Sequence, residues 1–340
     1  MRERIFFVTP FPLYPITNGG ARYSDFILRK LLRDGLDLTV FLPEENAEPG
    51  IPASNGPRYV FYRSRNALDH FLNPDLTAKL KQECLAHPPR CLYLDHPFGY
   101  FIVRNARGAS KIHVTTVLHN LEYQRYLSLG KPVAGGLIYA VEKTAIRRSD
   151  ALWAISETVA SAVETHFGRK PAVVPYTPDP KQFCPLPASD IIKLKQALYP
   201  GQPHVVLFFG DLTYAPNRDG AMFIRQKIIP AVFRKNRAVH FTLAGRGAEA
   251  WAGTDRLHTQ GHVEHIEGYL QAADLIIAPV EKGGGVSTKV IESLSCGKNV
   301  LVTPFVAAGL DAGMCSRVRT FEREAFAGAI LDYFRDRVTG

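Results

Sequence analysis

The sequence predicts an α/β protein with two doubly wound parallel sheets, because three features of the chain agree. Short apolar, β-rich runs alternate with longer amphipathic segments along its 340 residues, the pattern of parallel strands joined by crossover helices. The segment Tyr176–Asp190 is rich in proline and lacks helical or strand periodicity, as a connector does. Beyond it the alternation begins again. We therefore expect an N-terminal domain over 1–178, a linker over 179–200 and a C-terminal domain over 201–340.

The predicted strands follow in order along the chain. In the first domain they are RIFFVT (4–9), LDLTVFLP (36–43), CLYLDH (91–96), KIHVTTVLHN (111–120), ALWAIS (151–156) and PAVVPY (171–176). In the second they are HVVLFFGD (204–211), AVHFTLAGRG (238–247), ADLIIAPV (273–280) and NVLVTP (299–304). The segment NGGARYSDFILRKLLRDG (18–35) predicts a glycine-rich turn that opens a helix, which ends at Gly35.

The composition is that of a soluble globular protein, with 46% hydrophobic and 21% charged residues. The apolar run near the start, ahead of Thr9, is too short for a signal peptide. We find no apolar stretch of membrane-spanning length, so a cytoplasmic location is expected. The five cysteines are scattered and form no CxxC pair, which predicts reduced thiols rather than disulfides or a zinc site.

The formal net charge of +9 predicts attraction to anions, either phosphates or an acidic membrane face. The positive charges are not gathered in one long run, and aromatic residues do not interleave with them as in a nucleic-acid groove. A nucleic-acid partner is therefore not expected.

Three consecutive glycines, Gly283–Gly285, separate a predicted strand from a short amphipathic segment that ends at Gly297. In an open α/β sheet, ligands bind where such loops follow the carboxyl ends of strands. Ser287 or Thr288 is placed to cap the new helix. The amides and the positive end of that helix favour an anion such as a diphosphate, which glycines allow to approach closely.

Lys289 and Glu292 lie three residues apart, on one face of this predicted helix. A lysine in the first turn opposes the helix dipole, which suggests that it neutralises phosphate while the glutamate binds sugar hydroxyls. From spacing alone, an ordinary surface ion pair behind a flexible loop explains the pattern equally well.

A second glycine turn, Gly19 and Gly20, opens the first predicted helix and is placed to receive another part of the same ligand. A turn that needs positive φ explains it equally well. The chain has no GxGxxG after a strand and no GxxxxGK[ST] motif, so a dinucleotide oxidoreductase and a P-loop enzyme are disfavoured.

Six segments in a fixed order resemble the retaining, GT4-type glycosyltransferases of the GT-B fold. They are PFPLYPITNGGARYSDFILRKL, LHNLEYQRY, SDALWAISETVASAVETHFG, AVVPYTPDPKQFCP, VVLFFGDLTYAPNRDGAMFIRQKIIPAV and GYLQAADLIIAPVEKGGGVSTKVIESLSCGKNVLVTP. Together they span nearly the whole chain. The resemblance implies two Rossmann-like domains whose parallel sheets face across a cleft, with a nucleotide-sugar donor in that cleft.

The resemblance also implies roles for individual residues. Glu292 would bind the donor ribose, the amides of 285–288 would hold the diphosphate, and His119 would contact the transferred sugar. The implied catalytic residues are His119, Lys289 and Arg218. The implied donor-binding residues are Gly19, Gly20, Arg246, Val263, Gly284, Gly285, Val286, Ser287, Thr288 and Glu292. No metal or other cofactor is implied, because the sequence has no HExxH motif and no DxD motif at a plausible loop.

This sequence departs from the family pattern at two positions. Gly284 stands where the E-x7-E pattern has a glutamate that touches the transferred hexose, and Glu281 lies three residues earlier. Ser287 stands where many glycine-rich members carry arginine. The identity of the sugar is therefore left open.

The resemblance implies metal-independent transfer, with retention, of a sugar from a nucleotide-diphosphate donor to a hydroxyl, in polysaccharide, glycolipid or glycoconjugate synthesis. The acceptor would be a sugar, a lipid-linked group or another hydroxyl compound. Basic, aromatic stretches at 59–71 and 121–132 are candidates for peripheral contact with an anionic membrane, or are ordinary surface. A non-catalytic nucleotide-sugar-binding subunit and a nucleotide-sugar epimerase of the same fold are the alternatives.

Overall fold

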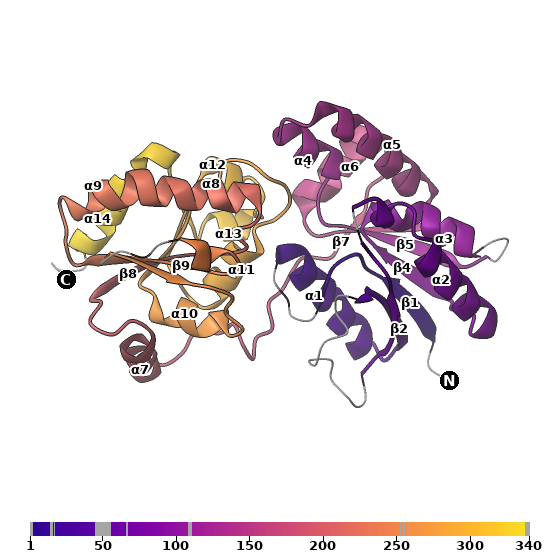
Figure 1. The fold of residues 1–340 in the computed structure, drawn as a ribbon, viewed down its shortest axis with the longest axis horizontal. Coiled ribbons are helices and arrows are strands. Elements are labelled where there is room, and N and C mark those ends of the chain that lie inside the picture. Colours follow the sequence, from indigo (N-terminus) through magenta and orange to yellow (C-terminus); the bar gives the residue numbers. More distant parts are fainter. Residues whose placement is uncertain are drawn as a thin grey trace. The chain divides into compact units, whose positions relative to one another are not determined.

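The computed structural model describes residues 3–13, 16, 18–44, 56–65, 67–107, 111–251, 253 and 256–336. The chain divides into two compact units, Met1–Tyr176 with Gly284–Val286, and Thr177–Gly283 with Ser287–Gly340. Each unit contains one parallel sheet covered by helices (Figure 1). The predicted α/β class with two parallel sheets is confirmed.

The sheet of the first unit has the strand order β3-β2-β1-β4-β5-β6-β7, and its neighbouring strands pair in parallel. Its strands are β1 (Arg4–Val8), β2 (Asp37–Pro43), β3 (Arg58–Tyr62), β4 (Cys91–Asp95), β5 (His113–Leu118), β6 (Ala151–Ala154) and β7 (Ala172–Val173). Its α-helices are α1 (Gly19–Arg33), α2 (Pro74–Ala86), α3 (Tyr100–Arg107), α4 (Glu122–Ser128), α5 (Pro132–Arg148) and α6 (Glu157–Phe167).

The second sheet has the order β10-β9-β8-β11-β12-β13, again with parallel pairs. Its strands are β8 (His204–Phe209), β9 (Val239–Ala244), β10 (Leu257–Gln260), β11 (Leu275–Ala278), β12 (Val300–Val302) and β13 (Arg319–Thr320). Its helices are α7 (Ala188–Leu198), α8 (Ala215–Phe223), α9 (Ile229–Phe233), α10 (Ile266–Ala272), α11 (Thr288–Ser295), α12 (Pro304–Ala307), α13 (Ala312–Cys315) and α14 (Phe326–Asp336). A π-helical turn, Ile224–Ile228, joins α8 to α9.

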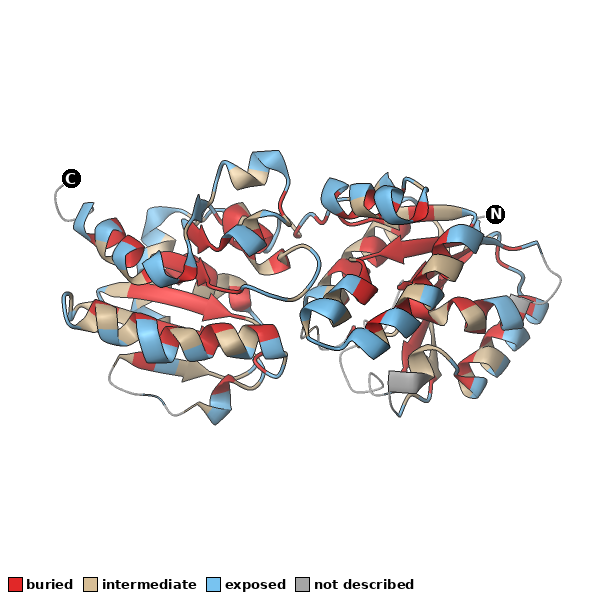
Figure 2. Cartoon of the chain, turned by 90° about the horizontal axis from the view of Figure 1, so that it is seen from above, coloured by how far each residue is buried: buried red, intermediate tan, exposed pale blue. Residues whose placement is uncertain are grey.

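The strand orders place the helices on both faces of each sheet. Crossovers between parallel strands are right-handed, so connections that run in opposite directions along a sheet lie on opposite faces. In the second unit, α8–α9 and α14 pack together on one face, and α10 and α7 pack together on the other (Figure 1). Burial follows this layering: strands are buried, and helices expose their outer surfaces (Figure 2).

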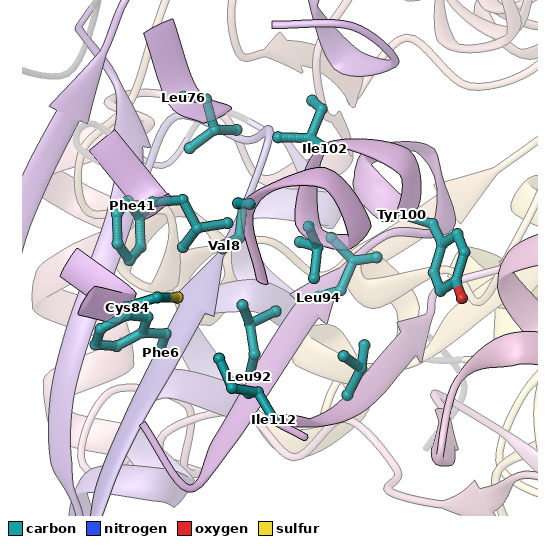
Figure 3. Packing of buried hydrophobic residues seen from close by; sticks show 14 of the residues in the cluster. Phe6, Val8, Phe41, Leu76, Cys84, Leu92, Leu94, Tyr100, Ile102 and Ile112 are labelled. Atoms are coloured by element: carbon teal, nitrogen blue, oxygen red, sulfur yellow. The ribbon is translucent and has the colours of Figure 1, made fainter. Parts of the chain in front are cut away.

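The core of the first unit joins the central strands to α2 and α3 (Figure 3). Phe6 on β1 and Phe41 on β2 meet edge-to-face, with ring centroids 5.3 Å apart. Leu80 and Cys84 of α2 pack against the same cluster, and burial raises the pKa of the Cys84 thiol to about 11. All five cysteines are free thiols.

Three strands were not predicted, and all three lie at sheet edges: β3, β10 and β13. An edge strand has one neighbour and more exposed side chains, so its apolar signal is weak. The exposed or half-buried residues of β3 and β13 fit this explanation. The expected linker also contains a helix: α7 lies within 179–200 and packs on α10.

In each sheet the strand order reverses at one point, between β1 and β4 in the first unit and between β8 and β11 in the second. Two neighbouring loops leave the sheet in opposite directions there, which opens a crevice outside the carboxyl ends of the strands. Ligand-binding residues are therefore expected in the loops that follow these four strands. None of the helices in the described parts of the chain is both long and apolar enough to cross a membrane.

Two glycines let the loops after β8 and β9 lie against each other. Gly210 has φ +141° and Gly245 has φ +124°, values that side-chain-bearing residues rarely adopt. A Cβ on Gly245 would lie 2.2 Å from the carbonyl oxygen of Gly210. The close approach extends the pairing of these strands, because the Gly210 amide donates to the Ala244 carbonyl at 2.9 Å.

Gly245→Ala is expected to lower the free energy of unfolding by at least about 3 kcal/mol, since strain and steric overlap act together. Gly201→Ala is the matched control, because Gly201 also has positive φ, +71°, but no atom lies near the added Cβ. The control should lose about 1 kcal/mol. Urea unfolding measures both, and equal losses would contradict the importance of the close approach.

Candidate functional site

In the second unit, Asp211 organises the loop that follows β8. Its carboxylate accepts hydrogen bonds from the Thr213 amide at 2.9 Å and the Thr213 hydroxyl at 2.5 Å, and it pairs with the Arg246 guanidinium. Burial raises the pKa of Asp211, but these hydrogen bonds outweigh it and hold the pKa below its usual value. The ion pair fixes Arg246 at the end of β9 while leaving 46% of its side chain exposed.

Lys289, in the first turn of α11, directs its ammonium group into this loop. Its Nζ donates to Asn217 Oδ1 at 2.8 Å and lies 4.6 Å from the centroid of the Phe208 ring. The Asn217 amide in turn donates to the Asp211 carbonyl at 2.9 Å. A Cβ on Gly210 would lie 3.1 Å from the Lys289 Nζ. Glycine therefore makes room for the ammonium group.

Desolvation makes Lys289 an unusual lysine. Burial lowers its pKa to about 8, and the negative charge of Glu292, one turn later, opposes the shift only partly. Glu292 itself is fully buried, with 0% exposure. The alternative of a surface ion pair is therefore wrong, because one partner is in the interior.

The start of α11 has no side-chain cap. Ser287 occupies the N-cap position, but its side chain makes no capping hydrogen bond, so the expectation that Ser287 or Thr288 caps the helix with its hydroxyl is not met. The Thr288 side chain is buried instead. The first amides of a helix have no partner within it and carry its positive end.

The glycine loop has the backbone that its composition demands. Gly283 and Gly285 have φ of +131° and +77°, and a Cβ on Gly283 would lie 3.1 Å from the Tyr214 hydroxyl oxygen. Gly284, between them, is exposed. Glu281, at the start of the loop, forms an ion pair with Arg323 at 3.2 Å.

The remaining predicted residues of this unit are less closely connected. Arg218 is exposed on α8, and its neighbour Asn217 makes the contact with Lys289. Val263 lies half-buried in the loop between β10 and α10. Val286, which groups with the first unit, is half-buried just before α11. Sequence reasoning missed Asn217 and Asp211; the position of Asp211 directly after a buried strand was the available signal.

In the first unit, the end of β4 and the loop after β5 bring a buried carboxylate to a histidine. His119 Nε2 lies 2.6 Å from Asp95 Oδ1. The second oxygen of Asp95 accepts from the hydroxyls of Thr9, at 2.6 Å, and Ser24, at 2.5 Å. Burial raises the pKa of Asp95, but the His119 contact and the two hydroxyls together hold it below its usual value.

Aromatic rings surround His119, which is 7% exposed. The Phe11 ring stacks on it with centroids 5.3 Å apart, and Tyr23 meets it edge-on at 4.9 Å. Gly19 and Gly20 belong to α1 and lack positive φ. The alternative explanation of these glycines, a turn that needs positive φ, is therefore wrong. A Cβ on Gly20 would lie 2.8 Å from the Phe11 ring; this glycine provides space for Phe11.

A second histidine, not predicted, lies beside His119. His96 is 4% exposed, its ring centroid is 5.7 Å from that of His119, and its backbone has φ 90° and ψ 136°. Such a conformation costs a residue with a side chain about 1–3 kcal/mol. His96 Nε2 lies 3.3 Å from Glu122 Oε1.

The carboxylate of Glu122 is firmly ionised. Burial raises its pKa, but His96 and Arg125 outweigh burial and bring the pKa to about 2. Glu142 of α5 holds the start of α4 by accepting the amides of Glu122 and Tyr123 at 2.7 and 2.9 Å. Burial, with the nearby charge of Glu122, raises the pKa of Glu142 to about 8.

In the described parts of the chain, no group of three or more His, Cys, Asp or Glu side chains is arranged to hold a metal ion.

Both halves of the chain match known protein families. Residues 17–182 match the family described as Glycosyltransferase Family 4, and residues 203–336 match Glycosyl transferases group 1. No curated protein matches the sequence significantly. The chain is a glycosyltransferase of the GT-B fold, with a family-4 domain followed by a group-1 domain.

Solved structures with this fold include sucrose-phosphate synthase from Thermosynechococcus elongatus, with a TM-score of 0.77 and 14% identity over 99% of this chain and 90% of that chain. HepE from Anabaena in complex with UDP-glucose has a TM-score of 0.72 and 18% identity over 98% and 90%. WaaG, a glycosyltransferase involved in lipopolysaccharide biosynthesis, has a TM-score of 0.68 and 15% identity over 99% and 90%. At these identities the likeness establishes the fold.

Proposed function

We propose that this glycosyltransferase moves a sugar from a nucleotide-diphosphate donor to an acceptor hydroxyl, with retention and without a metal, in polysaccharide, glycolipid or glycoconjugate synthesis. The observation that carries the proposal is the Lys289 ammonium, held by Asn217 and the Phe208 ring beside the uncapped start of α11. A desolvated cation next to free helix amides is suited to a diphosphate. The complex of HepE with UDP-glucose supports a donor of this class.

In this reaction the bond from the sugar anomeric carbon to the phosphate oxygen breaks while a bond to the acceptor oxygen forms. The acceptor attacks on the face from which the phosphate leaves, and its proton passes to that phosphate. Lys289 and the amides of 285–288 stabilise the departing diphosphate, an electrostatic contribution that is usually the largest in such sites. Arg218 and Arg246 add positive charge, and Glu292 binds the ribose hydroxyls.

The first unit has a positioning role in the proposal. His119 contacts the transferred sugar, and Asp95 fixes the imidazole through Nε2. Gly19 and Gly20 at the start of α1 bind a further part of the donor. Because Gly284 carries no carboxylate, the hexose must be recognised by other groups.

Lys289→Met should weaken binding of the preferred nucleotide-sugar at least about tenfold, because a charge-assisted contact to phosphate is lost. Thermal-shift screening of UDP-, GDP-, ADP- and dTDP-sugars identifies that donor, and calorimetry gives the affinity. Wild-type affinity should fall as the pH rises through about 8, where the free Lys289 ammonium loses its proton. Lys289→Met should lack this step.

Lys193→Met, on the exposed surface of α7, is the matched control and should behave as wild type. NMR of the product anomer tests retention, and transfer in EDTA tests metal independence. The proposal fails if none of these donors binds, or if Lys289→Met binds as tightly as wild type. Epimer formation from donor alone would identify an epimerase; binding without transfer to a broad acceptor panel would favour a non-catalytic subunit.

We also propose that α4 and α5 contact an anionic membrane that carries the acceptor. Leu127, Val133 and Leu137 are exposed by 49%, 80% and 69%, and Leu127 adjoins α5, because a Cβ on Gly135 would lie 3.0 Å from it. Exposed Lys131 lies between the two helices. Apolar side chains with neighbouring positive charge are suited to a lipid surface. The other candidate, 59–71, includes Asn66, which lies outside the described residues.

Wild-type protein should cosediment with phosphatidylglycerol-containing vesicles more than with phosphatidylcholine vesicles. Val133→Ser with Leu137→Ser should reduce that binding several-fold, since most of the apolar contact is removed. Ile192→Ser is the control, because Ile192 is an exposed apolar residue of α7. Equal cosedimentation of wild type with both vesicle types would refute the membrane contact.

A further inference from the structure

His96 combines a strained backbone conformation with a buried side-chain nitrogen that makes no hydrogen bond. Its φ of 90° places a side-chain-bearing residue in a region that favours glycine, and the following Pro97 restricts the backbone further. Its Nδ1 is buried and makes no hydrogen bond. Strained residues and unsatisfied buried polar groups are uncommon, and both concentrate at functional sites.

The other ring nitrogen of His96, Nε2, contacts the carboxylate of Glu122. Glu122 is ionised, so the contact of 3.3 Å between its Oε1 and His96 Nε2 requires a proton on Nε2. In the neutral ring Nδ1 is then an acceptor, turned away from Glu122. Because Arg125 also bonds to Glu122, at 2.7 Å, the carboxylate is held in place and the imidazole cannot readily turn over.

Two aromatic rings lie beside His96 and indicate which kind of ligand could bind its free nitrogen. Phe98 lies 4.3 Å away and Phe11 lies 5.8 Å away, ring centroid to ring centroid. Phe11 also stacks on His119. It is only half-buried, and its ring contacts both imidazoles. Aromatic faces beside a hydrogen-bond acceptor suit the C–H face and a hydroxyl of a sugar. His96 follows β4, a strand beside the reversal of the strand order, and His119 follows the neighbouring strand β5.

We infer that His96 is a second sugar-binding histidine: when the Phe11 ring turns aside, Nδ1 accepts a hydrogen bond from a sugar hydroxyl beside His119. This rests on the proposed function and adds to it. It supplies the hexose contact that Gly284 lacks, and it accounts for the strain and the unsatisfied nitrogen. The hydroxyl belongs to the hexose of the donor or to a sugar acceptor, which share this chemistry.

Two variants separate the nitrogens of the ring. Gln places its amide near the position of imidazole Nε2, and Asn places its amide near Nδ1. His96→Gln should therefore keep the Glu122 contact and lose the sugar contact, whereas His96→Asn should retain part of the sugar contact. His113→Gln is the matched control, because His113 is exposed at the opposite end of β5 from His119.

The measurement is the affinity for the nucleotide-sugar divided by the affinity for the same nucleoside diphosphate alone. In His96→Gln this ratio should fall about tenfold, while affinity for the diphosphate stays within about twofold of wild type. A purely structural role for His96 would weaken both ligands and lower the melting temperature together. If no nucleoside diphosphate binds to wild type, the proposed function fails. If it binds, the affinity ratio and the melting temperature of His96→Gln test the role of His96 separately.

A second readout uses wild-type protein with ¹⁵N-labelled histidine, so it does not depend on a variant that folds. The His96 Nδ1 resonance should move when the nucleotide-sugar is added and stay in place with the diphosphate alone. Movement only after free glucose, mannose or galactose joins the diphosphate complex would assign the hydroxyl to the acceptor. An unchanged affinity ratio, together with an Nδ1 resonance that moves with none of these, would overturn the inference.

Discussion

The second unit depends on one desolvated charge, the ammonium of Lys289. Burying a cation is unfavourable unless polar groups and a ring face replace the water, and Asn217 and Phe208 do so here. Gly210 has no side chain where the ammonium lies, and Gly245 lets the next loop close over Gly210. The glycines, the asparagine and the strand-end loop are therefore parts of one arrangement. A pKa lowered to about 8 is the measurable consequence.

In the described part of the first unit, most buried polar side chains are hydrogen-bonded, and the exceptions are His96 Nδ1 and Asn120 Oδ1. Asp95 has partners on both oxygens, and Glu122 and Glu142 together fix the start of α4. His96 differs from these residues because it combines a strained backbone with a buried nitrogen that makes no hydrogen bond. The two proposals give a ligand as the further partner of one group in each unit, Lys289 in the second and His96 in the first.

Much of the fold followed from periodicity, because parallel strands buried on both faces give continuous apolar runs. The edge strands β3, β10 and β13 gave no such run and were missed. For the candidate site, the sequence singled out the glycine loop, Lys289, Glu292 and His119, because they lie in segments with a recognisable pattern; their roles stay predictions. Asn217, Asp95 and His96 were not, because their importance arises from contacts between loops far apart in the chain. Backbone strain, as at His96, has no residue-type signature at all.

Hydrogen exchange measured by mass spectrometry, with and without the nucleoside diphosphate of the preferred donor, tests the central claim most directly. Helix-terminal amides that bind phosphate exchange more slowly than open ones. The account predicts slowed exchange in peptides that cover the start of α11 and the loop between β8 and α8, centred on Lys289 and Asn217. Binding that leaves both peptides unchanged, with protection elsewhere, would contradict it.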